Sequence, residues 1–469
     1  MIQHYVELIK NSLIYGVPRW FSAFIGIILI PILTRYLSPS EFGSVSLALV
    51  LIGIVSMLII FGMDSAIGYY VNFSKDTQRR SYISTSLVFL LFSIFLYNVL
   101  LIVFSTYMSD FIFHTNSFLI YFVIFIIPAQ VVFLFFQNLL LWTHRSKEYF
   151  IQSIGYSILF TMLIIIFVVI FHFGNQGVFI AYLVSYSVLS LFGFMYTKDL
   201  YRLEFHYEKC IALLQYGYPF LFVGLVSVLL SSNDKIFLSV LLNLGEVGIY
   251  TIGVGLSSAL SLITSGFQTA LGPFAFKIAS DSNSKIVYSR IFLYYSYIIS
   301  FFWLGLVLFS KEILMVLVPS QYQIAYIVVP FLAGGVIMTG FLNIFCLSAG
   351  ITKNTHLIAI SSLSGLCMNM ILMVFLIPHF GILGAAGASF VSICTSSIVM
   401  NILGQKIFFI DYPYKKAGLV FLIACIFWNL SLLTNTFSLL SSILLKIVLI
   451  FLFGILIFQL LKFDKHFFI

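Results

Sequence analysis

The stretch HFGNQGVFIAYLVS (residues 172–185) returns later in the chain as HFGILGAAGASFVS (residues 379–392), an offset of 207 positions. Three further pairs repeat in the same order. YGVP at 15–18 returns as YGYP at 216–219, SEFG at 40–43 as GEVG at 245–248, and GMDSAIG at 62–68 as GFQTALG at 266–272. Because all four offsets lie between 201 and 207, the chain contains an internal duplication, and this duplication decides the fold.

The composition is typical of a membrane protein. Of the 469 residues, 62% are hydrophobic and 8% are charged, and the mean hydropathy is +1.14. A soluble surface needs more charge than this, whereas repeated apolar runs of 18 or more residues indicate transmembrane helices. We therefore expect an all-α integral membrane protein. The net charge of +8 is explained by membrane topology rather than by nucleic-acid binding.

Polar and Gly/Pro breaks divide the chain into about fourteen candidate transmembrane helices. The first run is too long for the core of a cleavable leader, which has about 7–15 residues. The spans are predicted at 12–34, 42–63, 82–106, 117–142, 150–171, 177–197, 211–241, 246–270, 290–310, 324–348, 357–377, 383–404, 417–433 and 439–461. The seventh is long enough to be tilted or partly exposed.

The distribution of Lys and Arg tests this topology. With fourteen spans both termini share one side, and eighteen of the 23 basic residues fall on that side, whereas only Arg35 and Lys311 fall on the other. Basic loops stay in the cytoplasm, so both termini are predicted to be cytoplasmic. Arg19, Lys235 and Lys446 remain inside spans. We expect Lys311 and Lys446 to be interfacial anchors.

The duplicated unit covers six spans, and an even number keeps both copies in the same orientation. The sequence therefore predicts an N-terminal lobe at 1–207 and a C-terminal lobe at 208–406, related by a parallel pseudo-twofold repeat, with two appended C-terminal helices at 407–469. Transporters built from such repeats hold their substrate between the two lobes and expose it to each side of the membrane in turn.

Three segments resemble the polysaccharide-transporter branch of the multidrug/oligosaccharidyl-lipid/polysaccharide (MOP) flippase superfamily, and within it the Wzx O-antigen flippases. They are IPILTRYLSPSEFGSVSLALVLIGIVSMLIIFGMDSAIGYY (30–70), NDKIFLSVLLNLGEVGIYTIG (233–253) and LIPHFGILGAAGASFVS (376–392). With the repeat, the resemblance covers roughly residues 10 to 405.

The resemblance implies a bacterial inner-membrane protein of the MATE-like MOP fold, active in polysaccharide and lipopolysaccharide biosynthesis. Its substrate would be an undecaprenyl-diphosphate-linked glycan such as an O-antigen repeat unit, which it would translocate to the outer leaflet. Implied partners are the lipid bilayer, H⁺ or Na⁺ as a coupling ion, and the polysaccharide polymerase machinery. No cofactor or metal is implied.

Three alternative functions fit the sequence less well. The sequence has no HExxH, GxSxG or Walker lysine, so enzyme chemistry is disfavoured. A membrane enzyme such as an O-antigen polymerase would also have a large outer loop. A MATE-type exporter would carry a carboxylate in the first span, and residues 12–34 contain none. A lipid II-type flippase would have a cavity richer in Arg.

Polar residues inside spans are the candidates for the transport path, because a diphosphate needs cations and a sugar needs hydroxyls and amides. Arg19 lies about 10 Å into the first span, where it either faces the cavity or snorkels to the headgroups. Asp64, whose repeat mate is Gln268, either joins the path, where it could pair with Arg19 of the same lobe, or is a helix-end carboxylate in water. Lys277 and Arg290 serve topology or contact the diphosphate where it enters from the cytoplasm.

Asn233, Asp234 and Lys235 interrupt the seventh span about 12 Å below the outer surface. Neighbours on a helix do not face each other, so the two charges cannot simply neutralise one another. We expect Lys235 to face the cavity and contact phosphate or sugar, and Asp234 to pair with a polar group as a gate or coupling carboxylate. The sequence does not fix the rotation of the helix, so it leaves open which of the two faces the path. Glu41 and Glu246, at matching outer turns, are expected to favour helix N-termini.

Overall fold

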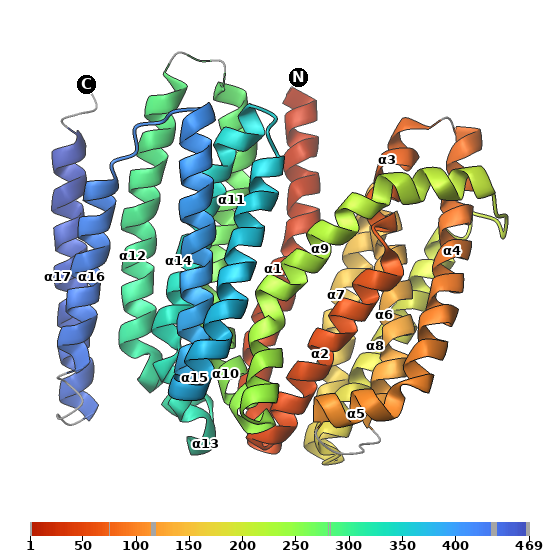
Figure 1. Ribbon diagram of the computed structural model, residues 1–469, viewed down its shortest axis with the longest axis horizontal. Helices are drawn as coiled ribbons and strands as arrows, with labels where there is room; N and C mark the ends of the chain where they lie inside the picture. The colour runs from red at the N-terminus through yellow and green to blue at the C-terminus, as the bar shows by residue number, and fades with distance from the viewer. Residues whose placement is uncertain are drawn as a thin grey trace. The chain divides into compact units, whose positions relative to one another are not determined.

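The computed structural model (Figure 1) describes residues 2–74, 76–113, 119–279, 281, 283–432 and 439–465. All regular structure in these ranges is helical, as predicted. For some of these residues, Arg19 among them, only the backbone is described.

The chain divides into two compact units, Met1–Gly248 and Ile249–Ile469. The first contains α1 (Ile2–Tyr36), α2 (Pro39–Ile60), α3 (Met63–Phe73), α4 (Asp76–Val103), α5 (Ser105–Phe113), α6 (Leu119–Trp142), α7 (Ser146–Ile164), the π-helix η1 (Ile165–Ile170), α8 (Gly174–Thr197) and α9 (Tyr207–Leu241). Then follow α10 (Leu244–Ser257), which crosses the boundary, α11 (Ala259–Ile278), α12 (Ser284–Leu317), α13 (Ser320–Gln323), the 3₁₀-helix η2 (Ile324–Ile327), α14 (Val329–Ile351), α15 (His356–Ile407), α16 (Tyr414–Leu432) and α17 (Leu439–Lys465).

Within the described residues, twelve helices are long and apolar enough to cross a membrane, or thirteen if the bent pair α10 and α11 counts as one span. α15 has 52 residues, or about 78 Å, more than twice the ~30 Å hydrocarbon core. It is a hairpin. Gly381 turns the chain with φ 57° and ψ −136°, a conformation that glycine adopts without strain. Across the bend, Ser392 Oγ donates to the Gly365 carbonyl at 2.8 Å. Counted as two spans, α15 brings the total to the predicted fourteen.

The turn before α2 forms a capping box. Ser38 Oγ accepts from the Glu41 backbone N–H at 3.3 Å, and Glu41 Oε2 accepts from the Ser38 backbone N–H at 2.9 Å. The expected role of Glu41 at this helix start is confirmed. In the matching turn, Glu246 lies in the first turn of α10, and its own backbone N–H donates to Asn243 Oδ1 at 3.0 Å.

α9 lies obliquely across α3 and α4 and also packs on α2 (Figure 1). The segment before it is tied to α4, because the backbone N–H groups of Arg202 and His206 donate to the buried hydroxyls of Ser84 (2.9 Å) and Thr85 (3.2 Å). By sequence α9 opens the second repeat, whereas by packing it belongs to the first unit. The division at 207/208 and 406/407 stays a prediction.

The first turns of α2 and α10, which are repeat mates, contact each other through backbone atoms. A β-carbon added to Gly43 would lie 1.8 Å from the Leu244 carbonyl oxygen, and one added to Gly248 would lie 2.0 Å from the Pro39 carbonyl oxygen. The offset of 205 that carries Gly43 to Gly248 also carries Pro39 to Leu244. The contact is therefore the same on both sides, and neither glycine can be replaced without separating the two helix starts.

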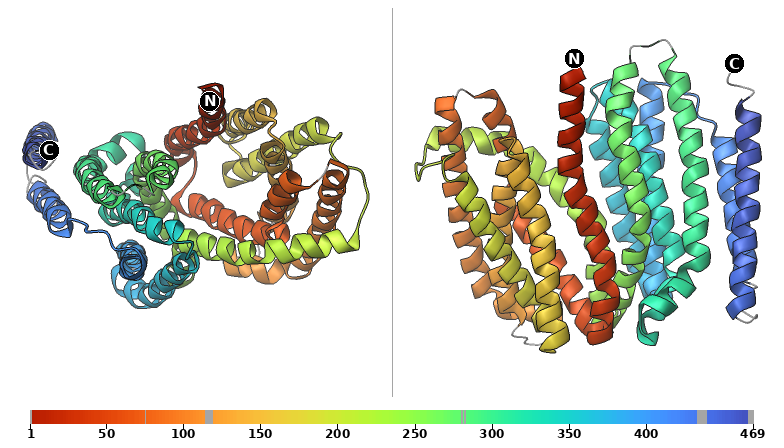
Figure 2. Two further views of the ribbon diagram at one scale, coloured as in Figure 1. Left: turned by 90° about the horizontal axis from the view of Figure 1, so that it is seen from above. Right: turned by 180° about the vertical axis from the view of Figure 1, so that it is seen from behind.

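In the second unit, α16 and α17 lie as a pair along one side of α12 (Figure 2). Trp303 of α12 packs against Phe421 and Trp428 of α16, with ring centroids 5.2 and 6.1 Å apart. Its indole N–H donates to the Pro330 carbonyl at 3.1 Å, so this buried aromatic also joins α12 to α14.

The glycine contact predicts a selective loss of stability. Gly43→Ala and Gly248→Ala should each destabilise the protein by about 1–3 kcal/mol through overpacking, because the clashing atoms are backbone carbonyls that cannot rotate away. Gly53→Ala on the same α2 is the control, since no atom lies within 4 Å of its added β-carbon. Apparent melting temperatures in detergent measure the effect, and a drop no larger than that of the control would contradict it.

Candidate functional site

The side chains of the Asn233–Lys235 triplet on α9 differ in burial and in their contacts. Asn233 and Asp234 are buried, with 2% and 7% of their surface exposed, whereas Lys235 is half-buried. The Lys235 ammonium donates to Ser46 Oγ on α2 at 3.1 Å, and Asp234 Oδ1 accepts from the backbone N–H of Lys235 at 2.8 Å. The lysine thus reaches a neighbouring helix rather than the carboxylate next to it in the chain.

Lys235 and Ser46 meet inside the membrane-spanning part of the first unit. Lys235 is six residues before the end of α9 and Ser46 is seven residues after the start of α2, which places them about 9 and 10 Å inside their helices. Sequence reasoning found the lysine and missed its partner. A lone Ser in an apolar run carries no signal, since serine hydroxyls commonly bond their own helix.

A second polar network that the sequence did not reveal lies deeper in the first unit. Ser56 Oγ of α2 donates to Gln130 Oε1 at 3.0 Å, and Gln130 Nε2 donates to the Tyr186 hydroxyl at 3.4 Å. Tyr186 in turn stacks on Tyr156, with ring centroids 4.8 Å apart. These groups join α2, α6, α7 and α8 and hold the first unit together as a polar core within apolar helices.

Asp64 is half-buried in the first turn of α3, where its charge suits the helix N-terminus. The preceding Gly62 lies against α9, since its added β-carbon would be 2.1 Å from the Gly217 carbonyl oxygen. Gly217 is eighteen residues before Lys235, about 27 Å along α9. The structure therefore does not bring Asp64 and Lys235 together. The predicted partnership of Asp64 with Arg19 falls on a side chain outside the described residues.

On the side that the sequence places in the cytoplasm, Arg145 pairs with Asp199 and joins the start of α7 to the end of α8. Its guanidinium donates to Asp199 Oδ1 at 3.1 Å and to the Tyr196 carbonyl. The hydrogen bonding of Arg145 to the carboxylate holds the pKa of Asp199 below its usual value. Its stabilising effect is present above the ordinary carboxyl pKa and is lost as the pH falls; it is small, because Asp199 is 58% exposed.

Gln268, the repeat mate of Asp64, makes an exposed amide–amide contact in the second unit. Its Nε2 donates to Asn343 Oδ1 of α14 at 3.3 Å. Lys277 is exposed in the last turn of α11, and Arg290 lies in the second turn of α12, so both flank the short connection between these helices. Their proposed contact with an entering diphosphate stays a prediction.

Lys446 is not the interfacial anchor that the sequence suggested. It is 4% exposed and its ammonium donates to Glu312 Oε1 of α12 at 2.5 Å. Lys446 lies seven residues inside α17, about 10 Å along the helix, and Glu312 lies within α12, so the two charges neutralise each other between helices. An isolated cation at that depth would be costly, which is why a paired position replaces the anchor.

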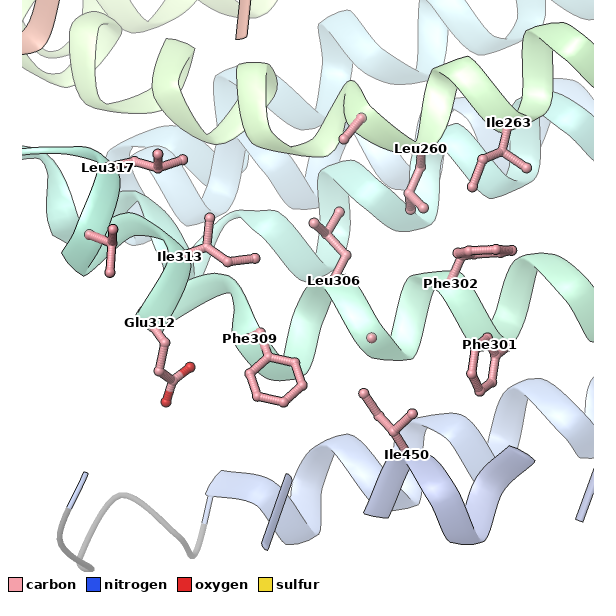
Figure 3. A pocket seen from close by; sticks show the side chains of 13 residues that line it. Leu260, Ile263, Phe301, Phe302, Leu306, Phe309, Glu312, Ile313, Leu317 and Ile450 are labelled. Atoms are coloured by element: carbon pink, nitrogen blue, oxygen red, sulfur yellow. The ribbon is translucent and has the colours of Figure 1, made fainter. Parts of the chain in front are cut away.

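A groove of about 770 Å³ beside this ion pair is lined by α11, α12 and α17 (Figure 3). Glu312 is its one charged lining residue, and the others are apolar apart from glycine; they include Leu260, Phe301, Phe309 and Ile450. The groove is large, yet its chemistry suits hydrocarbon rather than a sugar or a diphosphate. It is therefore separate from the polar candidates.

Comparisons with known proteins identify one matching family and several structures of similar fold. A family model described as a polysaccharide biosynthesis protein matches residues 8–279. No curated protein matches the chain. Of solved structures, the lipid II flippase MurJ in an inward closed conformation has a TM-score of 0.77 and 15% identity, covering 96% of this chain and all of that one.

Two further structures have the same fold. An inward-facing multidrug resistance MATE family transporter of the MOP superfamily has a TM-score of 0.62 and 14% identity, covering 84% of this chain and 94% of that one. A mutant of the Vibrio cholerae MATE transporter VcmN has a TM-score of 0.54 and 14% identity, covering 82% and 98%. At such identities the similarity shows the fold alone, and the predicted MOP-superfamily fold is confirmed.

The buried ion pair predicts a strongly non-additive response. Lys446→Met or Glu312→Gln alone should destabilise the protein by about 3–5 kcal/mol, because each leaves a buried charge without its counter-charge. Removing both groups together should cost less than the sum. Lys462→Met, a cation resting 5.0 Å from the Phe458 ring on the same α17, is the control. Thermal unfolding of the four variants measures the coupling, and additive losses would contradict it.

Proposed function

Because this chain belongs to the polysaccharide biosynthesis protein family, we propose that it is a flippase for an undecaprenyl-diphosphate-linked oligosaccharide, such as an O-antigen repeat unit. It carries the headgroup from the cytoplasmic to the outer leaflet of the bacterial inner membrane by alternating access, with both termini in the cytoplasm. The multi-pass helical fold and its MOP-superfamily neighbours support a transporter rather than an enzyme.

The observation that carries this proposal is the Lys235–Ser46 contact. A lysine inside a membrane span is costly and usually serves function. Here the ammonium donates to a neutral hydroxyl at 3.1 Å, and Lys235 is half-buried rather than enclosed. A phosphate oxygen makes a stronger, charge-assisted hydrogen bond than a hydroxyl does, so an arriving diphosphate can displace Ser46 from the ammonium. Lys235 is thus the proposed diphosphate contact.

Asp234 takes the other role left open by the sequence. It is buried, adjacent to Lys235 and on the same helix, so its charge acts on the same region of the first unit. We assign it to coupling with H⁺ or Na⁺, with Asn233 beside it as a neutral polar neighbour. Arg19, Asp64, Lys277 and Arg290 remain further candidates for the path, and a polysaccharide polymerase is the proposed recipient of the flipped unit.

A lipid II-type flippase is the second candidate. The observation in its favour is the coverage of 96% of this chain by that fold, which includes the appended pair α16 and α17. Both candidates move an undecaprenyl-diphosphate headgroup, and they differ in the attached glycan.

Deletion of the gene tests the proposal. Cells without the flippase should lose surface polysaccharide and accumulate the undecaprenyl-linked repeat unit on the cytoplasmic face of the membrane. Mass spectrometry of extracted lipids and surface glycan staining report the two effects. Unchanged surface glycan without accumulation would refute the proposal, whereas accumulation of lipid II would favour the second candidate.

Lys235→Ala should reduce translocation by about 10- to 100-fold, since it removes a charge-assisted hydrogen bond to phosphate. Lys235→Arg should retain part of the activity, and Lys416→Ala at the cytoplasmic start of α16 should retain all of it. Complementation of the deletion strain, with membrane insertion measured by immunoblot, separates lost activity from lost protein. Full activity of Lys235→Ala would remove the residue from the path.

A further inference from the structure

Hydroxyl and amide side chains follow one face of α11 in the second unit. Ser258 directly precedes the helix, and Ser261, Ser265 and Gln268 lie within it. Their spacing of three, four and three residues places them in a row. None of the four is buried, and the first and last are exposed. The serine hydroxyls donate to carbonyls one turn back at 2.5 to 3.1 Å and keep their oxygens as acceptors.

The neighbouring α14 continues this polar face. Asn343 accepts the hydrogen bond from Gln268, and Thr339 lies one turn before it and is exposed. The face therefore draws polar groups from two helices, centred on the pair of amides.

The amide pair lies well inside its two helices, away from their ends. Gln268 is ten residues before the end of α11 and Asn343 is eight residues before the end of α14, about 15 and 12 Å along their helices. The hydrocarbon core is about 30 Å thick. An exposed amide at this depth cannot face lipid, because unsatisfied polar groups in hydrocarbon cost several kcal/mol each. This face therefore borders water or a polar ligand.

The pair keeps hydrogen-bonding capacity for a ligand. Each primary amide has two N–H donors and one carbonyl acceptor, and their mutual bond uses one donor and one acceptor. Gln268 Oε1, a second Gln268 N–H and both Asn343 N–H groups have no other hydrogen-bond partner among the described residues. A ligand meeting them must both donate and accept, as hydroxyl and acetamido groups do.

We propose that the α11–α14 face is a sugar-binding subsite in which Gln268 and Asn343 hydrogen-bond the hydroxyl and acetamido groups of a neutral sugar residue. This rests on the proposed function and assigns the glycan, rather than the diphosphate, to the second unit. The nearest cation along α11 is Lys277, nine residues or about 14 Å beyond Gln268. A neutral face with balanced donors and acceptors fits a glycan and gives a phosphate no counter-charge.

Binding measurements with two lipids test this subsite. The probes are the lipid-linked oligosaccharide extracted from the source bacterium lacking this gene, and undecaprenyl diphosphate without sugar. Gln268→Leu and Asn343→Leu in nanodiscs should each weaken binding of the glycolipid by about 2- to 10-fold, the effect of one or two lost hydrogen bonds, and leave the sugarless lipid unchanged. Asn429→Leu, an exposed amide on the appended α16, is the matched control.

The outcomes separate this subsite from the proposed function. If the wild type binds the glycolipid and the variants bind it equally well, or if both probes weaken together, the subsite is wrong while the flippase proposal stands. If the wild type binds neither lipid, the proposed function fails and the subsite with it. Gln268→Ala and Asn343→Ala replace the leucine variants if those do not elute as folded protein.

Discussion

Two backbone contacts fix where α9 and α10 meet α2: Gly43 against the Leu244 carbonyl and Gly248 against the Pro39 carbonyl. Backbone atoms cannot change rotamer, so the contact fixes the first turn of α2 against the connection between α9 and α10. Ser46 follows Gly43 by about one helical turn of α2, and Lys235 lies about two helical turns before the end of α9. The 3.1 Å hydrogen bond between Lys235 and Ser46 therefore depends on the glycine contact.

The membrane constrains the remaining polar groups, and the chain satisfies it in three chemically distinct ways. Lys446 and Glu312 neutralise each other in an ion pair between α17 and α12. Lys235 donates to a neutral hydroxyl rather than to a carboxylate, so its hydrogen bond is exchangeable. Gln268 and Asn343 carry no charge; Gln268 is exposed and Asn343 is half-buried. The proposed recognition uses the last two arrangements, because a hydroxyl-bonded lysine and an amide pair can exchange their hydrogen bonds for those of a ligand.

Sequence reasoning predicted the architecture well and the side-chain contacts poorly, and the difference has a physical cause. Four repeated motifs and the basic-residue count identify the spans, because hydrophobic length and loop charge are set by the bilayer itself. The rotation of a helix that is apolar nearly all round is not set by the bilayer. The sequence therefore predicts a role for Lys235 but not its direction toward α2. It also predicts an anchor at Lys446, although Glu312 of α12 supplies a counter-charge at the same depth.

The two units also differ in the chemistry that they offer within the membrane. The described polar contacts of the triplet in the first unit centre on a lysine and a carboxylate, whereas the α11–α14 face of the second unit is neutral. By sequence both sets of groups belong to the second repeat, because α9 opens that repeat but packs in the first unit. The difference between the units therefore comes from where α9 packs. A lipid-linked glycan is itself unequal, with an anionic diphosphate at one end of the headgroup and neutral sugar beyond it. The proposed substrate matches this difference between the units, because the lysine contact suits its diphosphate and the neutral face suits its sugar.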